Sequence, residues 1–267
     1  MNIRKKIFLF ALLINIACEK SSDDLKLAEC VEYGIPPFDG TIFIDPDIIT
    51  PDDPTTFTSL NYSGKDNRTM YDRRNGGGWL DLEPYLFRSL YNDQLEIEIQ
   101  VNPEFDSIEN AKEQAEKFAP IIGRLTTELR KDVKTVWIHK GLEPFGGGNN
   151  NLLIHTDWSA KYYEKQGILE ETFVHEASHT SLDSYHAQNT EWLIAQKADC
   201  NFISTYAKEN PAREDIAESY LTYFAIRYRS DRISKELKQK IEQTIPNRIK
   251  YFDDQKFNIY PLQNNLK

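Results

Sequence analysis

Residues 168–186 read Ile-Leu-Glu-Glu-Thr-Phe-Val-His-Glu-Ala-Ser-His-Thr-Ser-Leu-Asp-Ser-Tyr-His. In a helix, His175 and His179 are four residues apart, so both imidazole rings project from one face, a turn apart. Two imidazoles at this spacing can bind a single Zn²⁺ ion. Phe173, Val174 and Ala177 fall on the other side of the helix, where they would anchor it to a sheet. The stretch therefore predicts an amphipathic helix that carries part of a metal site.

Glu176 stands beside the two histidines, where its carboxylate can reach a water molecule bound to the metal. Zn²⁺ lowers the pKa of such a water from about 15.7 towards 7. Glu176 would then take the proton during the attack on a substrate and return it to the leaving group. The alternative is two histidines and a glutamate on a solvated helix face. The chain has only five histidines, and a pair at this spacing around a glutamate favours the metal site.

A third ligand is expected from the stretch Asn210-Pro211-Ala212-Arg213-Glu214-Asp215-Ile216-Ala217-Glu218. Asn210 is a good N-cap and Pro211 a good first helical residue, so a helix is predicted to begin there. Steps of 100° per residue place Glu214 and Glu218 at the edge of its apolar face, and Asp215 points away. The apolar face itself would contain Leu221, Phe224, Ala225 and Tyr228.

Carboxylates that turn towards a core need a partner, such as a metal or a metal-bound histidine. Glu214 is therefore the expected third zinc ligand, and Glu218 the expected acceptor for the second N–H of a ligand histidine. The helix dipole, which favours acids in a first turn, is a competing explanation for Asp215 but not for Glu218. Asp183, one turn past His179, is the rival ligand, although three ligands in successive turns converge poorly on one ion.

The motif His175-Glu176-Ala177-Ser178-His179 resembles the His-Glu-x-x-His signature of the zincin metallopeptidases. One zincin branch continues with a glycine and a third histidine, but Leu182 and Tyr185 stand at those places here. The gluzincin branch takes a glutamate from a later helix in a Glu-x-x-x-Asp/Glu pattern, and Glu214 to Glu218 match this pattern. The resemblance spans residues 133–230.

The resemblance implies one Zn²⁺ ion, a polypeptide substrate and a mixed sheet whose edge strand aligns that substrate above the zinc helix. Residues 151–155 are the natural candidate for this edge strand. Family members often use a tyrosine or histidine to stabilise the oxyanion. Tyr206, Tyr185 and His155 all remain possible for that role.

The rest of the chain predicts a sheet first and helices last. Residues 95–101 alternate apolar and polar side chains, and the turn signal Asn92-Asp93 pairs them with residues 85–91 as a hairpin. Ser107 is expected to cap a helix to about Ala119, followed by a short helix near 124–131. Residues 134–139 and 151–155 predict two more strands, and Gly146-Gly147-Gly148-Asn149-Asn150 between them looks too loose for a tight hairpin. Helix is expected from about residue 168 onward, so the predicted fold class is α+β. The resemblance implies that this α+β fold is zincin-like.

The N-terminus carries the features of a bacterial lipoprotein. Arg4, Lys5 and Lys6 precede a short apolar run, and Ala17 precedes Cys18, which predicts a signal peptide of residues 1–17 and acylation of Cys18. An ordinary secretory signal is the alternative. Residues 18–56 would then be tether and loop, and residues 57–267 the hydrolase domain. Its β-rich part would span 57–105 and its catalytic part 106–267.

Charge and cysteines limit the location and the partners. The formal charge of −10, without a basic run outside the signal, makes nucleic acid an unexpected partner. In an oxidising compartment Cys30 and Cys200 could pair, or remain two thiols. The expectation is a zinc peptidase of the outer membrane or cell surface, held to the membrane by its lipid anchor only. Hydrolysis of a non-peptide amide, or a surface binding module with a structural or vestigial zinc site, are the alternatives.

Overall fold

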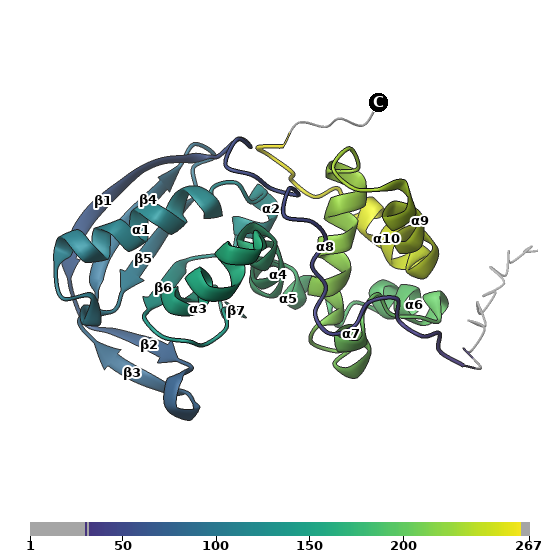
Figure 1. Cartoon of the computed structure of the whole chain (residues 1–267), viewed down its shortest axis with the longest axis horizontal. Coiled ribbons are helices and arrows are strands. Elements are labelled where there is room, and N and C mark those ends of the chain that lie inside the picture. The colour runs from purple at the N-terminus through teal and green to yellow at the C-terminus, as the bar shows by residue number, and fades with distance from the viewer. Residues whose placement is uncertain (1–29, 31, 263–267) are drawn as a thin grey trace, which may run out of the picture.

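The computed structural model describes residue 30 and residues 32–262, so the signal peptide and Cys18 lie outside the described residues. In chain order the strands are β1 (Phe57–Lys65), β2 (Arg68–Asp72), β3 (Gly78–Leu82), β4 (Tyr85–Tyr91), β5 (Glu96–Val101), β6 (Thr135–His139), β7 (Gly146–Gly148) and β8 (Asn151–His155). The helices are η1 (Arg74–Gly76), η2 (Pro103–Phe105), α1 (Ile108–Ile122), α2 (Thr127–Arg130), α3 (Thr156–Trp158), η3 (Ser159–Glu164), α4 (Leu169–Ser181), α5 (Asp183–His186), α6 (Thr190–Asp199), α7 (Thr205–Glu209), α8 (Asp215–Tyr228), α9 (Lys235–Thr244) and α10 (Pro246–Asp254). The fold is α+β, with a mixed sheet followed by a helical C-terminal half, as the sequence predicts (Figure 1).

The main sheet has six strands in the order β1-β4-β5-β6-β8-β7. Strands β4 and β5 form the antiparallel hairpin expected from their alternation. Strands β5, β6 and β8 run parallel, and β7 runs antiparallel to β8. The prediction that residues 151–155 form the edge was therefore wrong, because Gly146–Gly148 pairs outside them. Three consecutive glycines carry neither alternation nor β-propensity, so no local signal marks them as a strand.

Helix α1 covers one face of this sheet (Figure 1). The Ser107 hydroxyl accepts a hydrogen bond from the backbone N–H of Asn110, which confirms the expected N-cap. Ala111, Ala115 and Phe118 are buried against the sheet, as predicted. The helix ends at Ile122, slightly later than expected, and the following helix α2 is shorter than predicted.

Helix α8 runs through the centre of the helical half, and its residues 215–226 are all buried. It begins at Asp215, so the prediction of a helix start at Pro211 was wrong. The backbone N–H groups of Arg213 and Glu214 both donate to the carbonyl of Asn210, which closes a separate turn before the helix. Asp215 does not face solvent as expected, because Arg248 of α10 lies 3.0 Å from its carboxylate and both side chains are fully buried.

The segment before β1 runs along the helical half, beside α7 and α8, before it reaches the sheet (Figure 1). Ile42, Ile48 and Ile49 belong to the hydrophobic core, and Cys30 forms a disulfide bond with Cys200. These residues are loop, as predicted, but the described part of the segment is no tether. The folded body therefore begins well before residue 57.

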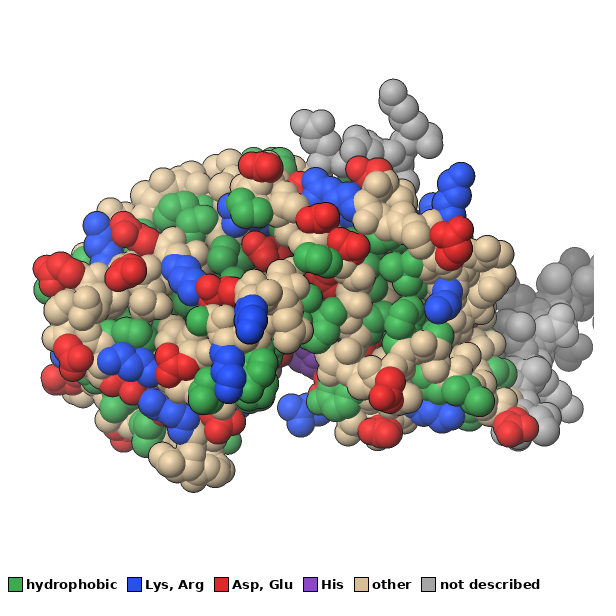
Figure 2. All heavy atoms as spheres, viewed as in Figure 1, with side chains coloured by type: hydrophobic (Ala, Val, Ile, Leu, Met, Phe, Trp, Pro, Cys, Tyr) green, Lys and Arg blue, Asp and Glu red, His purple; other side chains and the backbone are tan. Residues whose placement is uncertain are grey.

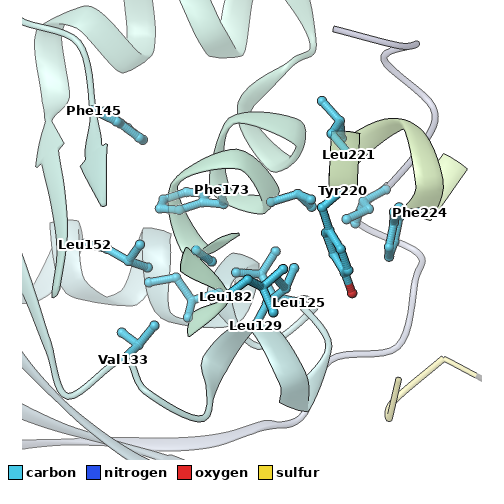
Figure 3. Packing of buried hydrophobic residues seen from close by; sticks show 14 of the residues in the cluster. Leu125, Leu129, Val133, Phe145, Leu152, Phe173, Leu182, Tyr220, Leu221 and Phe224 are labelled. Carbon is cyan, nitrogen blue, oxygen red and sulfur yellow. The ribbon is translucent and has the colours of Figure 1, made fainter. Parts of the chain in front are cut away.

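One hydrophobic core joins the sheet to the helices through α4. Figure 3 shows Phe145 and Leu152 on the sheet side, Phe173 in the middle, and Tyr220 and Leu221 of α8 on the other side. All five side chains belong to one hydrophobic cluster. Helix α4 is therefore fixed from both sides, which gives the side chains on its remaining face defined positions. Between residues 32 and 262, no helix is long and apolar enough to cross a membrane.

Candidate metal centre

His175, His179 and Glu214 converge on one point. The Nε2 atoms of His175 and His179 lie 3.2 Å apart. Glu214 Oε2 lies 3.2 Å from His179 Nε2 and 3.5 Å from His175 Nε2. The α4 helix supplies both histidines, and the turn that precedes α8 supplies the glutamate. Among the described residues, these two histidines and one glutamate are the cluster of side chains that could hold a metal ion.

The three separations fit a tetrahedral zinc site. Zinc binds imidazole nitrogen and carboxylate oxygen at about 2.0–2.1 Å, which places the ligand atoms of a regular tetrahedron about 3.3 Å from one another. The distances of 3.2, 3.2 and 3.5 Å agree with that geometry. Three protein ligands leave the fourth position free, as in catalytic rather than structural zinc sites.

The second nitrogen of His179 faces a carboxylate. Its Nδ1 lies 2.8 Å from Asp183 Oδ2, on the opposite side of the ring from Nε2. Asp183, the rival ligand, therefore orients His179 instead of joining the cluster. Burial by itself would lower the pKa of His179, but hydrogen bonds with Asp183 and Glu214 outweigh it and raise that pKa to about 10. The surroundings of Nε2 thus favour a positive charge.

Glu218 stands behind His175 in the same way. Its Oε1 lies 3.4 Å from His175 Nδ1, and among the described residues neither atom has a hydrogen-bond partner. The other oxygen accepts hydrogen bonds from the Ser204 hydroxyl at 2.6 Å and from the backbone N–H of Ile42 at 2.9 Å. Burial raises the pKa of Glu218, and the nearby His175 opposes the shift. Glu218 therefore lies where an orienting acceptor for His175 was predicted.

The cluster also acts on Glu214. Burial would raise the pKa of this carboxyl, but hydrogen bonds and charges from His175 and His179 hold that pKa well below its usual range. Glu214 is therefore an anion at neutral pH, which is the form that binds a metal. Its other oxygen lies 3.2 Å from the guanidinium of Arg213, an exposed side chain at the mouth of the site.

These residues line a cleft of about 480 Å³ between the sheet and the helical half. Figure 2 shows the hollow between the two halves, with histidine at its base. Glu176 lines the cleft beside the ligands and has no ion pair or hydrogen bond through its carboxylate within the described part of the chain. Its negative charge nevertheless contributes to the raised pKa values of His179 and Tyr163. An unpaired carboxylate beside a cation site can accept a proton from a molecule held there.

The edge strand β7 lies directly against α4. A Cβ atom at Gly147 would stand only 1.9 Å from the backbone carbonyl oxygen of Glu176, so only glycine permits this approach. The backbone N–H of Gly148 donates to the Thr180 hydroxyl, which ties the strand to the same helix. The expectation that the glycine run is too loose for a tight hairpin was wrong, because a two-residue turn of Asn149 and Asn150, both at positive φ, joins β7 to β8. The run also forms a wall of the cleft, a role that its sequence did not show.

The three candidates for oxyanion stabilisation have different places. Tyr206, from α7, lines the cleft, and burial together with the charge of Glu214 raises its pKa to about 12. Tyr185 is 53% exposed and lies outside the cleft lining, with the ammonium of Lys131 over its ring. His155 is fully buried, and its Nε2 faces Asp72 at 3.9 Å, away from the cluster. Of these three candidates, only Tyr206 lines the cleft and can contact a substrate there.

Tyr163 and Arg73 are among the lining residues that the sequence analysis missed. Tyr163, from η3, and Arg73, from the turn after β2, both border the cleft. Tyr163 lies near enough to Arg73 and Glu176 for both charges to influence its pKa, which burial raises. Neither residue belongs to a recognisable motif, and only the packing of the β2–β3 hairpin against the sheet brings Arg73 here.

Comparison with known proteins assigns the chain to no family. No family model, no curated protein and no solved structure matches the chain.

Proposed function

We propose that this protein is a zinc-dependent hydrolase with a zincin-like, gluzincin-type active site that cleaves amide bonds in polypeptides. The observation that carries the proposal is the triangle of His175 Nε2, His179 Nε2 and Glu214 Oε2, whose sides of 3.2, 3.2 and 3.5 Å suit one tetrahedral ion. These three residues would hold the ion. Bound zinc would supply a Lewis acid that polarises a carbonyl group and acidifies water.

Glu176 would act as the general base and then as the general acid. It stands next to the ligands in the chain and lines the same cleft, and within the described residues its carboxylate has no ion pair or hydrogen bond. It is therefore free to take a proton from the attacking water and to deliver it to the leaving nitrogen. Asp183 and Glu218 keep the two imidazoles oriented, and Tyr206 is placed to donate a hydrogen bond to the developing oxyanion.

Strand β7 supports a polypeptide as the substrate. It is the edge strand of the main sheet, and it forms the wall of the cleft beside Glu176. An extended peptide can bind to such an edge through main-chain hydrogen bonds, without any requirement for one side chain. Because β7 has no side chains of its own, the bound backbone can approach the cluster closely.

Two substitutions separate a catalyst from a binding module. A pool of amidated octapeptides with mixed sequence is incubated with the zinc-loaded protein, and cleavage is read by mass spectrometry. Glu176→Gln should lower the rate about 10²- to 10⁴-fold while zinc content stays unchanged. Glu214→Ala should lower both. The matched control is Glu170→Gln, which removes a partly buried carboxylate from the same helix outside the cleft. Cleavage that survives Glu176→Gln would refute the proposal.

The proposed location is outside the cytoplasm, on a lipid anchor at Cys18. The disulfide bond between Cys30 and Cys200 supports an oxidising compartment. The anchor itself lies outside the described residues. It would hold the protein at the membrane without any membrane-spanning segment.

A further inference from the structure

Apart from Arg213, which pairs with Glu214, Arg73 is the one charged group in the described cleft lining that has no part in the proposed ion site or proton transfer. It lies in the turn between β2 and β3, and it borders two hollows at once. The first is the catalytic cleft. The second, of about 220 Å³, lies across β7 and has Tyr71, Trp79 and Trp137 in its wall. The guanidinium therefore stands where the two hollows meet, beside the edge strand.

No carboxylate oxygen of the described residues lies within 4.0 Å of this guanidinium. Apart from Arg73 and Arg124, every arginine in residues 32–262 has a carboxylate oxygen within 4.0 Å. The hydrogen bond that Arg73 does form is a long one of 3.4 Å from Nη1 to the carbonyl of Pro144. In a chain with a formal charge of −10, a half-buried arginine without an acidic partner is unusual.

The backbone on both sides of Arg73 is fixed. Asp72 accepts hydrogen bonds from the backbone N–H of Arg74 at 2.9 Å and from its guanidinium at 2.6 Å. Arg74 also pairs with Glu104 at 2.8 Å, and Glu104 accepts the backbone N–H of Lys140 at the end of β6. The turn is thus locked to the main sheet. Such fixation reduces the entropy lost when the guanidinium binds a ligand.

The surroundings make the guanidinium an effective anion receptor. The aromatic wall of the second hollow places apolar surface on one side of the guanidinium, and a low-polarity surrounding strengthens a charge–charge interaction. An open guanidinium can form two parallel hydrogen bonds to a carboxylate. The charges of both Arg73 and Glu176 influence the pKa of Tyr163, so the guanidinium and the proposed general base lie near the same side chain.

We infer that Arg73 is a specificity-determining residue that binds a carboxylate of the substrate, within a few residues of the bond that is cut. This inference rests on the proposed function. The carboxylate has two possible sources, an aspartate or glutamate side chain and the C-terminal carboxylate of a peptide, and the test has an arm for each.

Three pools of octapeptides of otherwise mixed sequence distinguish the sources. One has a single aspartate or glutamate and an amidated C-terminus. The second replaces that residue with asparagine or glutamine, and the third is the second with a free C-terminal carboxylate. Cleavage by the wild type and by Arg73→Gln is compared for each pool. The matched control is Arg124→Gln, since Arg124 is also half-buried and has no carboxylate oxygen of the described residues within 4.0 Å, but lies outside both hollows.

The wild type should prefer one carboxylate-bearing pool over the neutral pool by about 10- to 100-fold, the effect of a charged hydrogen bond. Arg73→Gln should abolish the preference and still cleave the neutral pool, whereas Arg124→Gln should keep it. A wild type that treats all pools alike, or a preference that persists in Arg73→Gln, would overturn the inference.

Binding separates this inference from the proposed function. The same pools, labelled with fluorescein, are titrated against the Glu176→Gln variant and the Glu176→Gln/Arg73→Gln double variant by fluorescence anisotropy. If a carboxylate-bearing pool binds in an Arg73-dependent way but the wild type cleaves none of the pools, the proposed hydrolase function would be refuted. The role of Arg73 as a carboxylate-binding residue would be supported. Equal binding of all pools, or no binding at all, would refute the receptor.

Discussion

Replacing Gly147 with alanine tests how closely the edge strand must approach the helix that carries the cluster. The added Cβ would stand 1.9 Å from the Glu176 carbonyl oxygen, whereas ordinary contacts begin at 3.4 Å. Both partners are backbone, so no side chain can turn away. Strand and helix must therefore separate by about 1.5 Å, an overpacking that costs roughly 1–3 kcal/mol of unfolding free energy. A displacement of about 1 Å at an active site can cost about 10²-fold in rate.

Urea unfolding of Gly147→Ala measures the loss of stability, and kcat/KM on a cleaved peptide measures the loss of activity. Gly78→Ala is the control, because that glycine also lies in a strand, needs no positive φ and has open space around it. Its unfolding free energy and activity should stay near those of the wild type. If Gly147→Ala were as stable and as active as Gly78→Ala, the close contact between β7 and α4 would be wrong.

Three further outcomes follow from other parts of the molecule. Zinc binding must displace the proton of His179, whose pKa is raised to about 10. Because deprotonation favours the metal, the association constant for zinc should rise about tenfold per pH unit between pH 7 and 9. A chelator competition that shows no such pH dependence would contradict the raised pKa of His179. Asp215→Ala leaves the buried Arg248 with one partner fewer, so it should lower the free energy of unfolding in urea by about 3–5 kcal/mol. A loss of unfolding free energy below about 1 kcal/mol would contradict the buried ion pair. Mass spectrometry of membrane-extracted protein should find an acylated Cys18 at the N-terminus, and an unlipidated chain cleaved elsewhere would refute the anchor.

The parts of the fold that depend on local pattern could be predicted from the sequence. The alternation of residues 95–101 with its turn signal predicts the hairpin β4–β5, and the Ser107 cap predicts the start of α1. The cluster was predictable for the same reason. A spacing of four places His175 and His179 on one helical face, and Glu214 stands at the edge of an apolar stripe; the structure brings these three together.

The errors concern contacts between distant parts of the chain. Gly146–Gly148 pairs with β8, and Gly147 fits against the backbone of Glu176, a contact that the glycine run itself does not indicate. Asp215 is buried because Arg248 lies beside it, although 32 residues separate them in the sequence. Similarly, the loop near Ile42 enters the core because its backbone N–H satisfies the buried Glu218. Local periodicity contains none of these pairings.

The zinc content of the purified protein tests the central claim most directly. The wild type and Glu176→Gln, purified without chelators and supplied with zinc, are analysed for metal per chain, beside His179→Ala. The geometry of the cluster predicts one zinc per chain in the first two proteins and a loss of most of it in His179→Ala, which lacks one of three ligands. A wild-type protein that holds no zinc, or a His179→Ala variant that holds as much as the wild type, would contradict the metal centre and the hydrolase built on it.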